Sequence, residues 1–230
     1  MAAERLARIL ALLAADDRPS GRRLCEVAAE ATAMSGAGIA LLTAGGAQAS
    51  LGATDSVSSL IEDLQYTLGE GPCIDAQRLG TVIAEPNLAA TSRWTAFSER
   101  ALAGGAEAVF GFPIRLGAVA LGALDLYRDQ PGPLTDDQHA DALVMADVAA
   151  RFILSAQADA PPGDLDIDIA TDTHLWGVVH QAAGMVSVQL DIPVADALVR
   201  IRAHAFGADR RITEIARDIV ERRLSLDDDS

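Results

Sequence analysis

The last quarter of the chain, residues 172–224, holds three amphipathic helical patterns that are separated by joints of only a few residues. Apolar residues recur there at the spacing of one face of an α-helix. In the first pattern they are Trp176, Val179, Ala183, Val186 and Leu190. A proline disfavours helical geometry in the residue before it and suits the first turn of a helix. The pattern therefore predicts a break at Pro193 and a second helix after it.

The second and third patterns have the same character. Their apolar faces are Ala197, Leu198, Ile201 and Ala205, and then Ile212, Ile215, Ala216, Ile219 and Val220. Gly207 is placed to end the second helix, and Asp209 is placed to cap the third. Three short amphipathic helices with such short connections have only each other to pack against. The sequence therefore predicts a small three-helix bundle over residues 173–225.

The composition limits what the rest of the chain can do. The chain has 230 residues, 50% of them hydrophobic, and a formal net charge of −15 at pH 7. This length and hydrophobicity suffice for two domains that each have a core. The negative balance argues against a protein whose whole surface clamps nucleic acid. The two cysteines, Cys25 and Cys73, are too few for a disulfide framework.

The sequence shows neither a membrane span nor a secretory signal. Residues 1–17 place charged side chains within a short amphipathic pattern and lack the cleavage site of a secretory signal. No uncharged apolar stretch reaches the length that crosses a bilayer. We therefore expect a cytoplasmic protein that has no membrane partner.

Residues 1–158 alternate between helical and strand patterns. Helices are predicted at 3–15, 20–34, 56–68, 92–103 and 135–158, and strands at 37–42, 47–53, 81–84, 108–115 and 118–127. Glycine turns between consecutive strands favour hairpins, so this order predicts an α+β domain with an antiparallel sheet flanked by helices. The run Pro161-Pro162-Gly163 marks residues 159–172 as a linker. Residues 226–230 are expected to form a disordered acidic tail.

The carboxy-terminal helices resemble an RNA-binding family. Residues 180–186 (HQAAGMV) and 197–205 (ALVRIRAHA), with Ile212, Ile215 and Ala216 after them, resemble the ANTAR module. This module is a three-helix RNA-binding output domain of bacterial transcription antiterminators. The resemblance implies that the bundle binds paired hairpins in a leader transcript and favours the antiterminated form. One departure is Ala183, where many ANTAR modules carry a lysine, so we transfer no RNA contact to that position.

The first 158 residues resemble a GAF domain. Residues 64–73 (LQYTLGEGPC) are similar to a loop found in the GAF domains that precede ANTAR modules in actinobacterial proteins. Residues 112–114 (FPI) and 122–127 (GALDLY) fit the closing hairpin of the same fold. The resemblance implies a sensor domain that holds an unidentified small molecule or simply dimerises. Its ligand pocket would include Tyr66, Glu70 and Cys73.

Basic residues gather in the predicted bundle. Residues 193–224 contain seven arginines against five acidic residues, a balance of +2 within an acidic chain. The candidate RNA-binding residues are Arg200, Arg202, His204, Arg210 and Arg211. Arginines of this kind can contact RNA phosphates and the exposed bases of a hairpin loop. Charge alone favours a solvated helix face with ordinary ion pairs, and it is only the ANTAR resemblance that favours RNA.

The remaining reactive residues have structural explanations. Residues 69–72 (GEGP) lack the lysine and hydroxyl side chain of a phosphate-binding P-loop. Cys73 is either a redox-sensitive or ligand-contacting thiol, or a small buried apolar residue. The four histidines, His139, His174, His180 and His204, are not spaced as metal ligands. No catalytic grouping is evident, so we expect no enzyme activity, no cofactor and no metal.

Together these patterns predict a transcription antitermination regulator in which a GAF sensor domain controls an ANTAR-like output domain. Its partners would be structured RNA and a second copy of the chain. The helices at 3–15 and 135–158 have apolar seams, including Leu10 and Leu143, that suit a four-helix dimer contact. The alternative is a sensor or protein-interaction module whose helical domain contacts a protein. A DNA-binding helix-turn-helix is disfavoured because the second and third helices lack a row of base-reading side chains.

Overall fold

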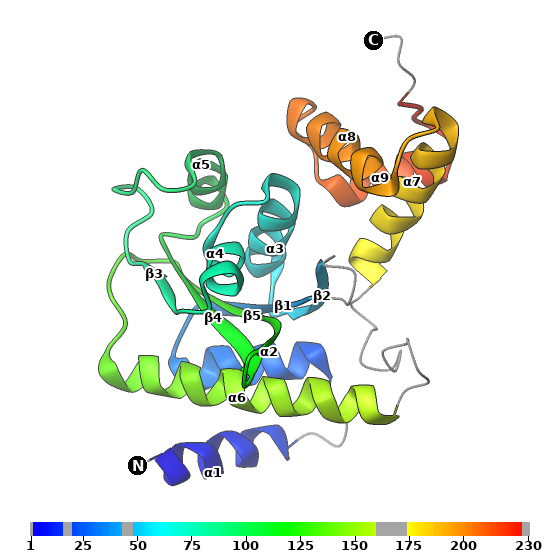
Figure 1. Ribbon diagram of the computed structural model, residues 1–230. Helices are drawn as coiled ribbons and strands as arrows, with labels where there is room; N and C mark the ends of the chain where they lie inside the picture. The colour runs from blue at the N-terminus through cyan, green and yellow to red at the C-terminus, as the bar shows by residue number, and fades with distance from the viewer. Residues whose placement is uncertain (1, 16–19, 43–47, 160–173, 227–230) are drawn as a thin grey trace.

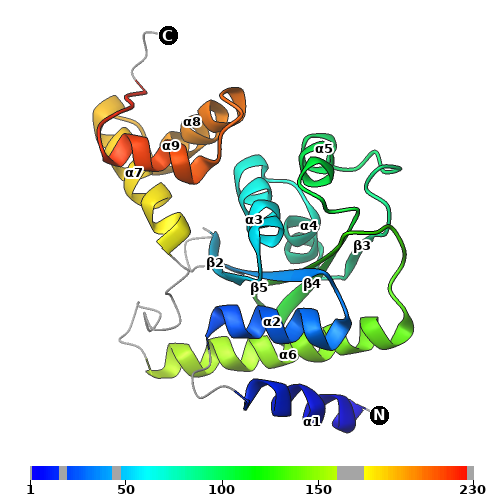
Figure 2. The ribbon, with the colours of Figure 1, turned by 180° about the vertical axis from the view of Figure 1, so that it is seen from behind.

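The computed structural model describes residues 2–15, 20–42, 48–159 and 174–226. These residues form a five-stranded sheet with helices on both faces, and a group of three helices that lies beside α3 (Figures 1 and 2). The expected linker lies outside the described residues from residue 160 onward. The hairpin turn at 43–47 and residues 227–230 of the expected tail also lie outside them.

Every strand pairing in the described sheet is antiparallel. The strands are β1 (Gly36–Leu42), β2 (Gln48–Ala53), β3 (Ile83–Glu85), β4 (Ala108–Leu116) and β5 (Val119–Arg128). Their order is β2-β1-β5-β4-β3, so β5 is central and pairs with both β1 and β4. The β4–β5 hairpin turns at Gly117, whose φ of 58° favours glycine. The antiparallel sheet predicted from the sequence is thus confirmed.

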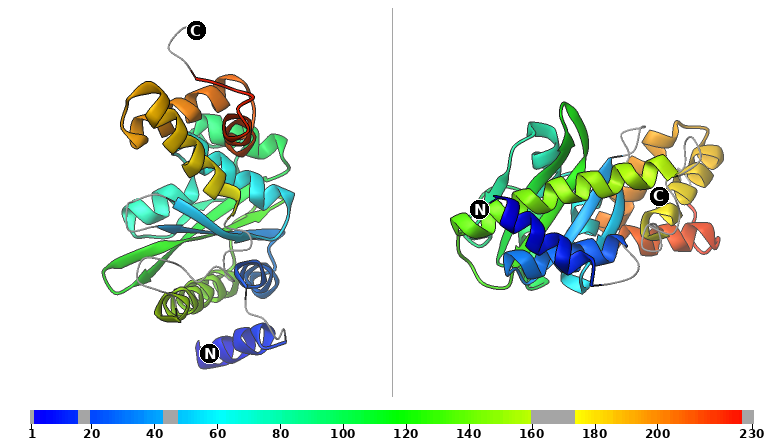
Figure 3. Two further views of the ribbon diagram at one scale, coloured as in Figure 1. Left: turned by 90° about the vertical axis from the view of Figure 1, so that its right-hand side faces the viewer. Right: turned by 90° about the horizontal axis from the view of Figure 1, so that it is seen from below.

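Helices cover both faces of this sheet, as Figure 3 shows. On one face lie α2 and α6, with α1 packed outside them, and on the other face lie α3 and α4, with α5 beside α3. In β5, Leu124 and Leu126 pack toward α2 and α6, whereas Asp125 lies on the side of α3, because side chains of a strand alternate between faces. These helices are α1 (Ala2–Leu13), α2 (Gly21–Thr32), α3 (Ser56–Leu68), α4 (Pro72–Leu79), α5 (Thr95–Ala103) and α6 (Asp136–Asp159).

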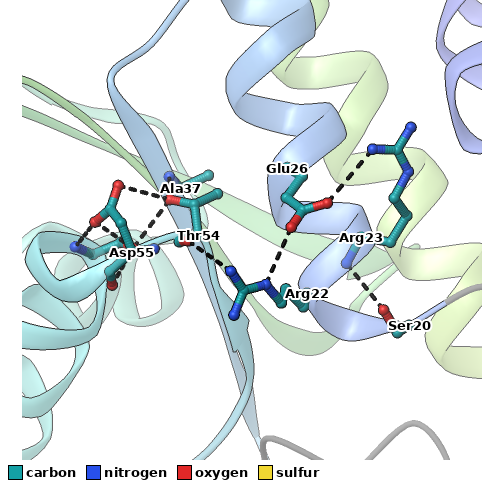
Figure 4. Close-up of polar contacts among 8 residues, drawn as sticks. Ser20, Arg22, Arg23, Glu26, Ala37, Thr54 and Asp55 are labelled. Atoms are coloured by element: carbon teal, nitrogen blue, oxygen red, sulfur yellow. Dashed lines mark hydrogen bonds and ion pairs between the residues drawn. The ribbon is translucent and has the colours of Figure 1, made fainter.

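The start of α3 is fixed by Asp55, which stands beside Thr54 directly after β2 (Figure 4). Its carboxylate accepts hydrogen bonds from the N–H groups of Val57 and Ser58 at 2.9 and 2.8 Å. The Ser58 hydroxyl accepts a hydrogen bond from Asp55 N, which completes a capping box. The Tyr127 hydroxyl of β5 donates to Asp55 Oδ2 at 3.0 Å. Burial alone would raise the pKa of Asp55, but its hydrogen-bond donors outweigh burial and lower that pKa.

The three remaining helices pack together as α7 (His174–Leu190), α8 (Val194–Gly207) and α9 (Ile212–Val220). Their buried apolar residues are Val179, Ala182, Ala183, Val186, Ala197, Ile201, Ala205, Ile212, Ile215, Ala216 and Ile219. The three predicted helices and most of their predicted apolar positions are therefore found in the structure. The side chain of Trp176 lies outside the described residues. Ala183 is fully buried, so the side chain of a lysine at this position would have to extend out of the bundle core to place its charge in water.

No single helix among the described residues is long and apolar enough to cross a membrane. The segments Gly177–Leu190 and Val194–Gly207 pass that test only when they are taken together, as a pair bent by 109°. Both segments contribute their apolar faces to the core of the three-helix bundle.

Several local expectations are wrong. Helix α4, which is not predicted from the sequence, follows the loop at 69–71 and starts at Pro72 because proline suits the first turn. Helix α5 starts at Thr95, after Trp94 in left-handed conformation, and β3 starts at Ile83. Asp209 does not cap α9, because the N-cap residue is Arg211. Likewise, Gly207 is the last residue of α8 and the C-cap is Ala208.

Two residues of the predicted dimer seams lie away from the core. Leu10 of α1 is 48% exposed, and Leu143 of α6 is 45% exposed. Ile9 and Ile153, from the same two helices, are buried in the core that α1, α2, α6 and the sheet share within one chain. The apolar side of α1 is therefore used inside the chain, and the homodimer stays a prediction.

The bundle core can be tested at Ile201, which is fully buried, against Val199, which is 60% exposed on the same helix. Ile201→Ala should lower the free energy of unfolding of the bundle by about 2–5 kcal/mol, because it leaves a cavity. Val199→Ala should change it by less than about 1 kcal/mol. Native-state hydrogen exchange of the amides in α7, α8 and α9 measures both. Equal effects of the two substitutions would contradict the packing described above.

Candidate functional site

The predicted RNA-binding residues of α8 lie in different environments. Arg200 and His204 are exposed, whereas Arg202 is half-buried. The guanidinium of Arg202 lies 4.7 Å from the centre of the Tyr66 ring, which belongs to α3. Successive residues of a helix are about 100° apart around its axis, so Arg200 and Arg202 project to nearly opposite sides of α8. The candidate residues therefore do not form one continuous cationic surface.

Tyr66 is the centre of the contact between α3 and the bundle. Its side chain is 1% exposed and packs with the apolar core of the bundle, not with that of the sheet domain. Arg202 stacks on its ring, and His180 of α7 meets it edge-on with 6.5 Å between the ring centroids. A cation held over an aromatic ring away from water contributes on the order of 2 kcal/mol. Burial raises the pKa of the Tyr66 hydroxyl, which keeps that group neutral.

Charged pairs complete this contact. Arg211, directly before α9, pairs with Asp63 of α3, with 3.4 Å between Nε and Oδ2. Arg100 of α5 pairs with Asp209, with 2.9 Å between Nη2 and Oδ1, and its guanidinium lies 4.6 Å from the centre of the Phe206 ring. A cavity of about 170 Å³ remains between these elements, lined by Leu60, Asp63, Leu64, Thr67, Arg100, Asp209, Arg210 and Arg211.

Arg210 is held by carboxylates of the bundle itself. It pairs with Glu214 at 3.4 Å and with Asp218 at 2.8 Å. Arg223 also pairs with Asp218, at 2.7 Å, and the hydrogen bonds from the two arginines lower the pKa of Asp218. Of the five predicted RNA-binding residues, two thus contact the sheet domain, one is paired within the bundle, and Arg200 and His204 are exposed.

The residues predicted for a ligand pocket are not brought together. Tyr66 packs against the bundle. Glu70 lies in the turn between α3 and α4, where its Oε1 accepts a hydrogen bond from Phe97 N at 3.2 Å. Cys73 is fully buried in the first turn of α4. Of the three, only Cys73 reaches the buried polar residues between α3 and the sheet.

These buried polar residues form a cluster of Glu62, Gln65, Cys73 and Asp125, enclosed by α3, α4 and β5. Gln65 joins its members. Its Nε2 donates to Asp125 Oδ2 at 2.7 Å, and its Oε1 accepts from Cys73 N at 2.6 Å. The carboxyl group of Glu62 and the thiol of Cys73 are both within hydrogen-bonding reach of Asp125. We call these four residues the buried acidic cluster.

Both carboxyl groups of the buried acidic cluster favour the protonated form. Burial, and then the charges of Asp125 and Asp63, raise the pKa of Glu62 well above its ordinary value. Burial likewise raises the pKa of Asp125, to about 6. Neither Glu62 Oε1 nor Asp125 Oδ1 accepts a hydrogen bond from an N–H group of the described residues. A proton on Glu62 lets the two groups hydrogen-bond, so at neutral pH the pair carries one proton and one negative charge.

Two glycines make room for the buried acidic cluster. Gly38 of β1 and Gly111 of β4 are the residues directly opposite Asp125 in the neighbouring strands. A Cβ on Gly38 would lie 2.5 Å from Glu62 Oε1, and one on Gly111 would lie 2.5 Å from the carbonyl oxygen of Pro72. Both distances are too short for a side chain. The glycines therefore allow α3 and α4 to approach the sheet closely.

The comparison with known proteins identifies the fold that holds the buried acidic cluster. No protein-family profile matches the chain. No curated protein matches it either. The GAF domain of a phosphoenolpyruvate-protein phosphotransferase from Coxiella burnetii superposes with a TM-score of 0.53 at 14% identity, covering 68% of this chain and 95% of that one. The GAF domain of the Acinetobacter phosphoenolpyruvate-protein phosphotransferase gives 0.51 at 15% identity, covering 69% and 96%.

The sheet-containing part of the chain has the GAF fold. Free methionine-R-sulfoxide reductase from Neisseria meningitidis, solved in complex with its substrate, is also similar, with a TM-score of 0.50 at 14% identity over 70% of this chain and 92% of that one. At these identities the likeness concerns the fold alone. We call residues 2–159 the GAF domain. Its α+β fold agrees with the expectation from the sequence.

Only weak signals of the buried acidic cluster are present in the sequence. Asp125 interrupts an otherwise apolar central strand, and Gly38 and Gly111 lack the β-branched side chains that strands favour. Glu62 and Gln65 are ordinary residues for an exposed helix face, so nothing in their spacing indicates burial. Among the described residues, no group of three His, Cys, Asp or Glu side chains is arranged to hold a metal ion. Cys25 and Cys73 are both buried thiols, and no disulfide joins them.

The protonation of Asp125 should appear in the pH dependence of stability. Its pKa is raised from 3.8 to about 6 on folding, so its stabilising contribution is complete below about pH 4 and is lost as the pH rises through 6. A shift of about two units corresponds to roughly 3 kcal/mol. Relative to Asp125→Asn, the wild type should therefore lose about that much free energy of unfolding between pH 4 and pH 7. Urea titrations at several pH values measure the difference.

The matched control for this titration is Asp147→Asn, because Asp147 is exposed on α6 and pairs only with Arg151 four residues away among the described ion pairs. The difference in free energy of unfolding between Asp147→Asn and the wild type should change little over the same pH range. If the difference in free energy of unfolding between Asp125→Asn and the wild type were equally independent of pH, Asp125 would not hold a proton in the folded chain at pH 5.

Proposed function

We propose that this protein is a two-part regulator, in which the GAF domain controls a three-helix bundle that binds structured RNA. Hairpins in leader transcripts are the proposed ligand, and transcription antitermination is the proposed outcome. The observation that carries the proposal is the bundle itself. Residues that resemble the ANTAR module occupy its core positions, and among them Ala182, Ile201 and Ala205 are fully buried.

The charges of α8 support a nucleic-acid ligand. Arg200 and His204 are one helical turn apart and are exposed on the same face. A guanidinium there can neutralise an RNA phosphate, and the imidazole of His204 can stack on an unpaired base of a hairpin loop. Arg202 and Arg211 add two further cations to the RNA-binding surface of the bundle when they separate from Tyr66 and Asp63 of α3.

The GAF domain is proposed as the sensing part. The buried acidic cluster lies inside the fold and takes Glu62 and Gln65 from α3, the helix that contacts the bundle, so a change of protonation there acts on α3 directly. A homodimer is part of the proposal as well, since two bundles in one particle would bind two hairpins with higher avidity than one.

A protein partner for the bundle is the second candidate. Val188, Val194 and Val199 are 84%, 53% and 60% exposed on the bundle surface. Exposed apolar side chains are frequent at protein contacts, although single ones are common on any surface. In this alternative the bundle binds a protein. Its affinity for RNA is then no greater than that of an acidic protein without an RNA-binding site.

The RNA proposal can be tested with a pool of synthetic RNAs that carry two tandem hairpins with randomised loops. Gel shifts of the full chain should show binding that weakens with salt. Arg200→Ala should weaken the binding and reduce the slope of log affinity against log salt by about one, because one phosphate contact is lost. Arg200 is preferable to Arg202 here, since removing Arg202 also removes a contact with α3.

The matched control is Arg151→Ala, which deletes an exposed arginine of α6 in the GAF domain. It should bind the pool as the wild type does. Equal affinity of wild type, Arg200→Ala and Arg151→Ala would remove Arg200 from the RNA surface. If neither the wild type nor variants whose bundle has left α3 bind the RNA pool at low salt, the protein-partner alternative is favoured.

A further inference from the structure

We infer that α3 of the GAF domain masks the RNA-binding surface of the bundle, so that this structure is a closed form and RNA binding requires the bundle to leave α3. This inference rests on the proposed function, and it names how the same surface is regulated. It begins from the residues of α3 that the bundle covers, which are Tyr66 and Asp63.

Tyr66 of α3 packs outside the apolar core of the GAF domain. Tyr66 packs with the bundle core, and the Asp63 side chain, which is 6% exposed, pairs with Arg211 of the bundle. The bundle therefore meets an aromatic ring and a carboxylate on α3. Their chemistry matches the groups that cover them, since a tyrosine ring attracts a guanidinium and a carboxylate pairs with one.

The contact also occupies the cations that RNA needs. While one face of the Arg202 guanidinium lies on the Tyr66 ring, that face is not available to stack on a base. Arg211 has its Nε directed to Asp63, so a phosphate must compete with this carboxylate for it. Asp63 and Tyr66 therefore take the places that a phosphate and a base would take, one acting as an anion and the other as an aromatic ring.

The contact is of a size and kind that can open. Besides the buried Tyr66 ring, it includes two cations on rings, one edge-on ring pair and the ion pairs Arg211–Asp63 and Arg100–Asp209, whose arginines are partly exposed. A cavity of about 170 Å³ remains between the two sides, so the packing is incomplete. Exposed ion pairs contribute about 0–1 kcal/mol each and weaken with salt. Such a contact is weak enough for RNA to displace it.

The test uses the full chain with Asp63→Asn and Tyr66→Ala together, which removes the mask and leaves every arginine of the bundle in place. The position of the bundle is measured by spin labels on Leu79→Cys of α4 and Val188→Cys of α7, both highly exposed, while the natural Cys25 and Cys73 are buried. Binding of the two-hairpin RNA pool is measured by gel shift. Asp147→Asn, which removes an exposed carboxylate of α6, is the charge-matched control.

Masking predicts a narrow label distance in the wild type and a broad one in the double variant, together with RNA binding at least about tenfold tighter in the variant. A broad distance with unchanged or weaker RNA affinity would overturn masking and leave RNA binding standing. A broad distance with no RNA binding in any form of the chain would overturn the proposed function itself. An unchanged distance would show that Asp63 and Tyr66 do not hold the bundle.

Discussion

The contact of Arg202 with Tyr66 determines how the two parts of this chain are joined. Tyr66 belongs to α3 by sequence, but its ring is buried among residues of the bundle, so the GAF domain donates a core residue to the bundle. Arg202 and His180 fix that ring from two helices, and Arg211 extends the contact to Asp63. The bundle is therefore placed by chemistry that belongs to α3, and any movement of α3 changes this placement.

The same helix carries the buried acidic cluster. Glu62 precedes Tyr66 by four residues, so the carboxyl pair and the bundle contact lie one turn apart along the same side of α3. Asp55 fixes the start of this helix and links it to β5 through Tyr127, and β5 carries Asp125. A carboxyl pair that shares a proton inside a domain is costly unless its hydrogen bonds are satisfied. Gln65 and Cys73 supply those bonds to Asp125. One short helix thus joins a titratable core to the arginines of the proposed output surface.

Much of the fold could be predicted because it depends on local periodicity. The stripes of α7, α8 and α9 and the β4–β5 hairpin are determined by residues close in sequence, and the structure contains them. The short helix α4 was missed because Gly71 and Gly80 bound it so closely that no helical period could be recognised. Asp209 is expected as a cap from its spacing, but the N-cap of α9 is Arg211, and Asp209 pairs with Arg100 of the GAF domain.

The candidate site was less predictable, because it depends on docking between elements far apart in sequence. Tyr66 and Cys73 lie within one motif, yet they belong to different cores, since a helix end and a turn separate their directions. Arg200 and Arg202 are two residues apart and face different surroundings. Spacing identifies which residues share a helical face, but it does not indicate which face another domain covers.

The most direct measurement is the accessibility of Tyr66 in the unmodified chain, by hydroxyl-radical footprinting and mass spectrometry, with and without the two-hairpin RNA pool. Tyr66 and Tyr127 are 1% and 6% exposed, so both should react slowly without RNA. If α3 masks the bundle, saturating RNA should make Tyr66 react several-fold faster and leave Tyr127 unchanged. A Tyr66 that stays protected while RNA is bound would contradict the masking of this surface by α3.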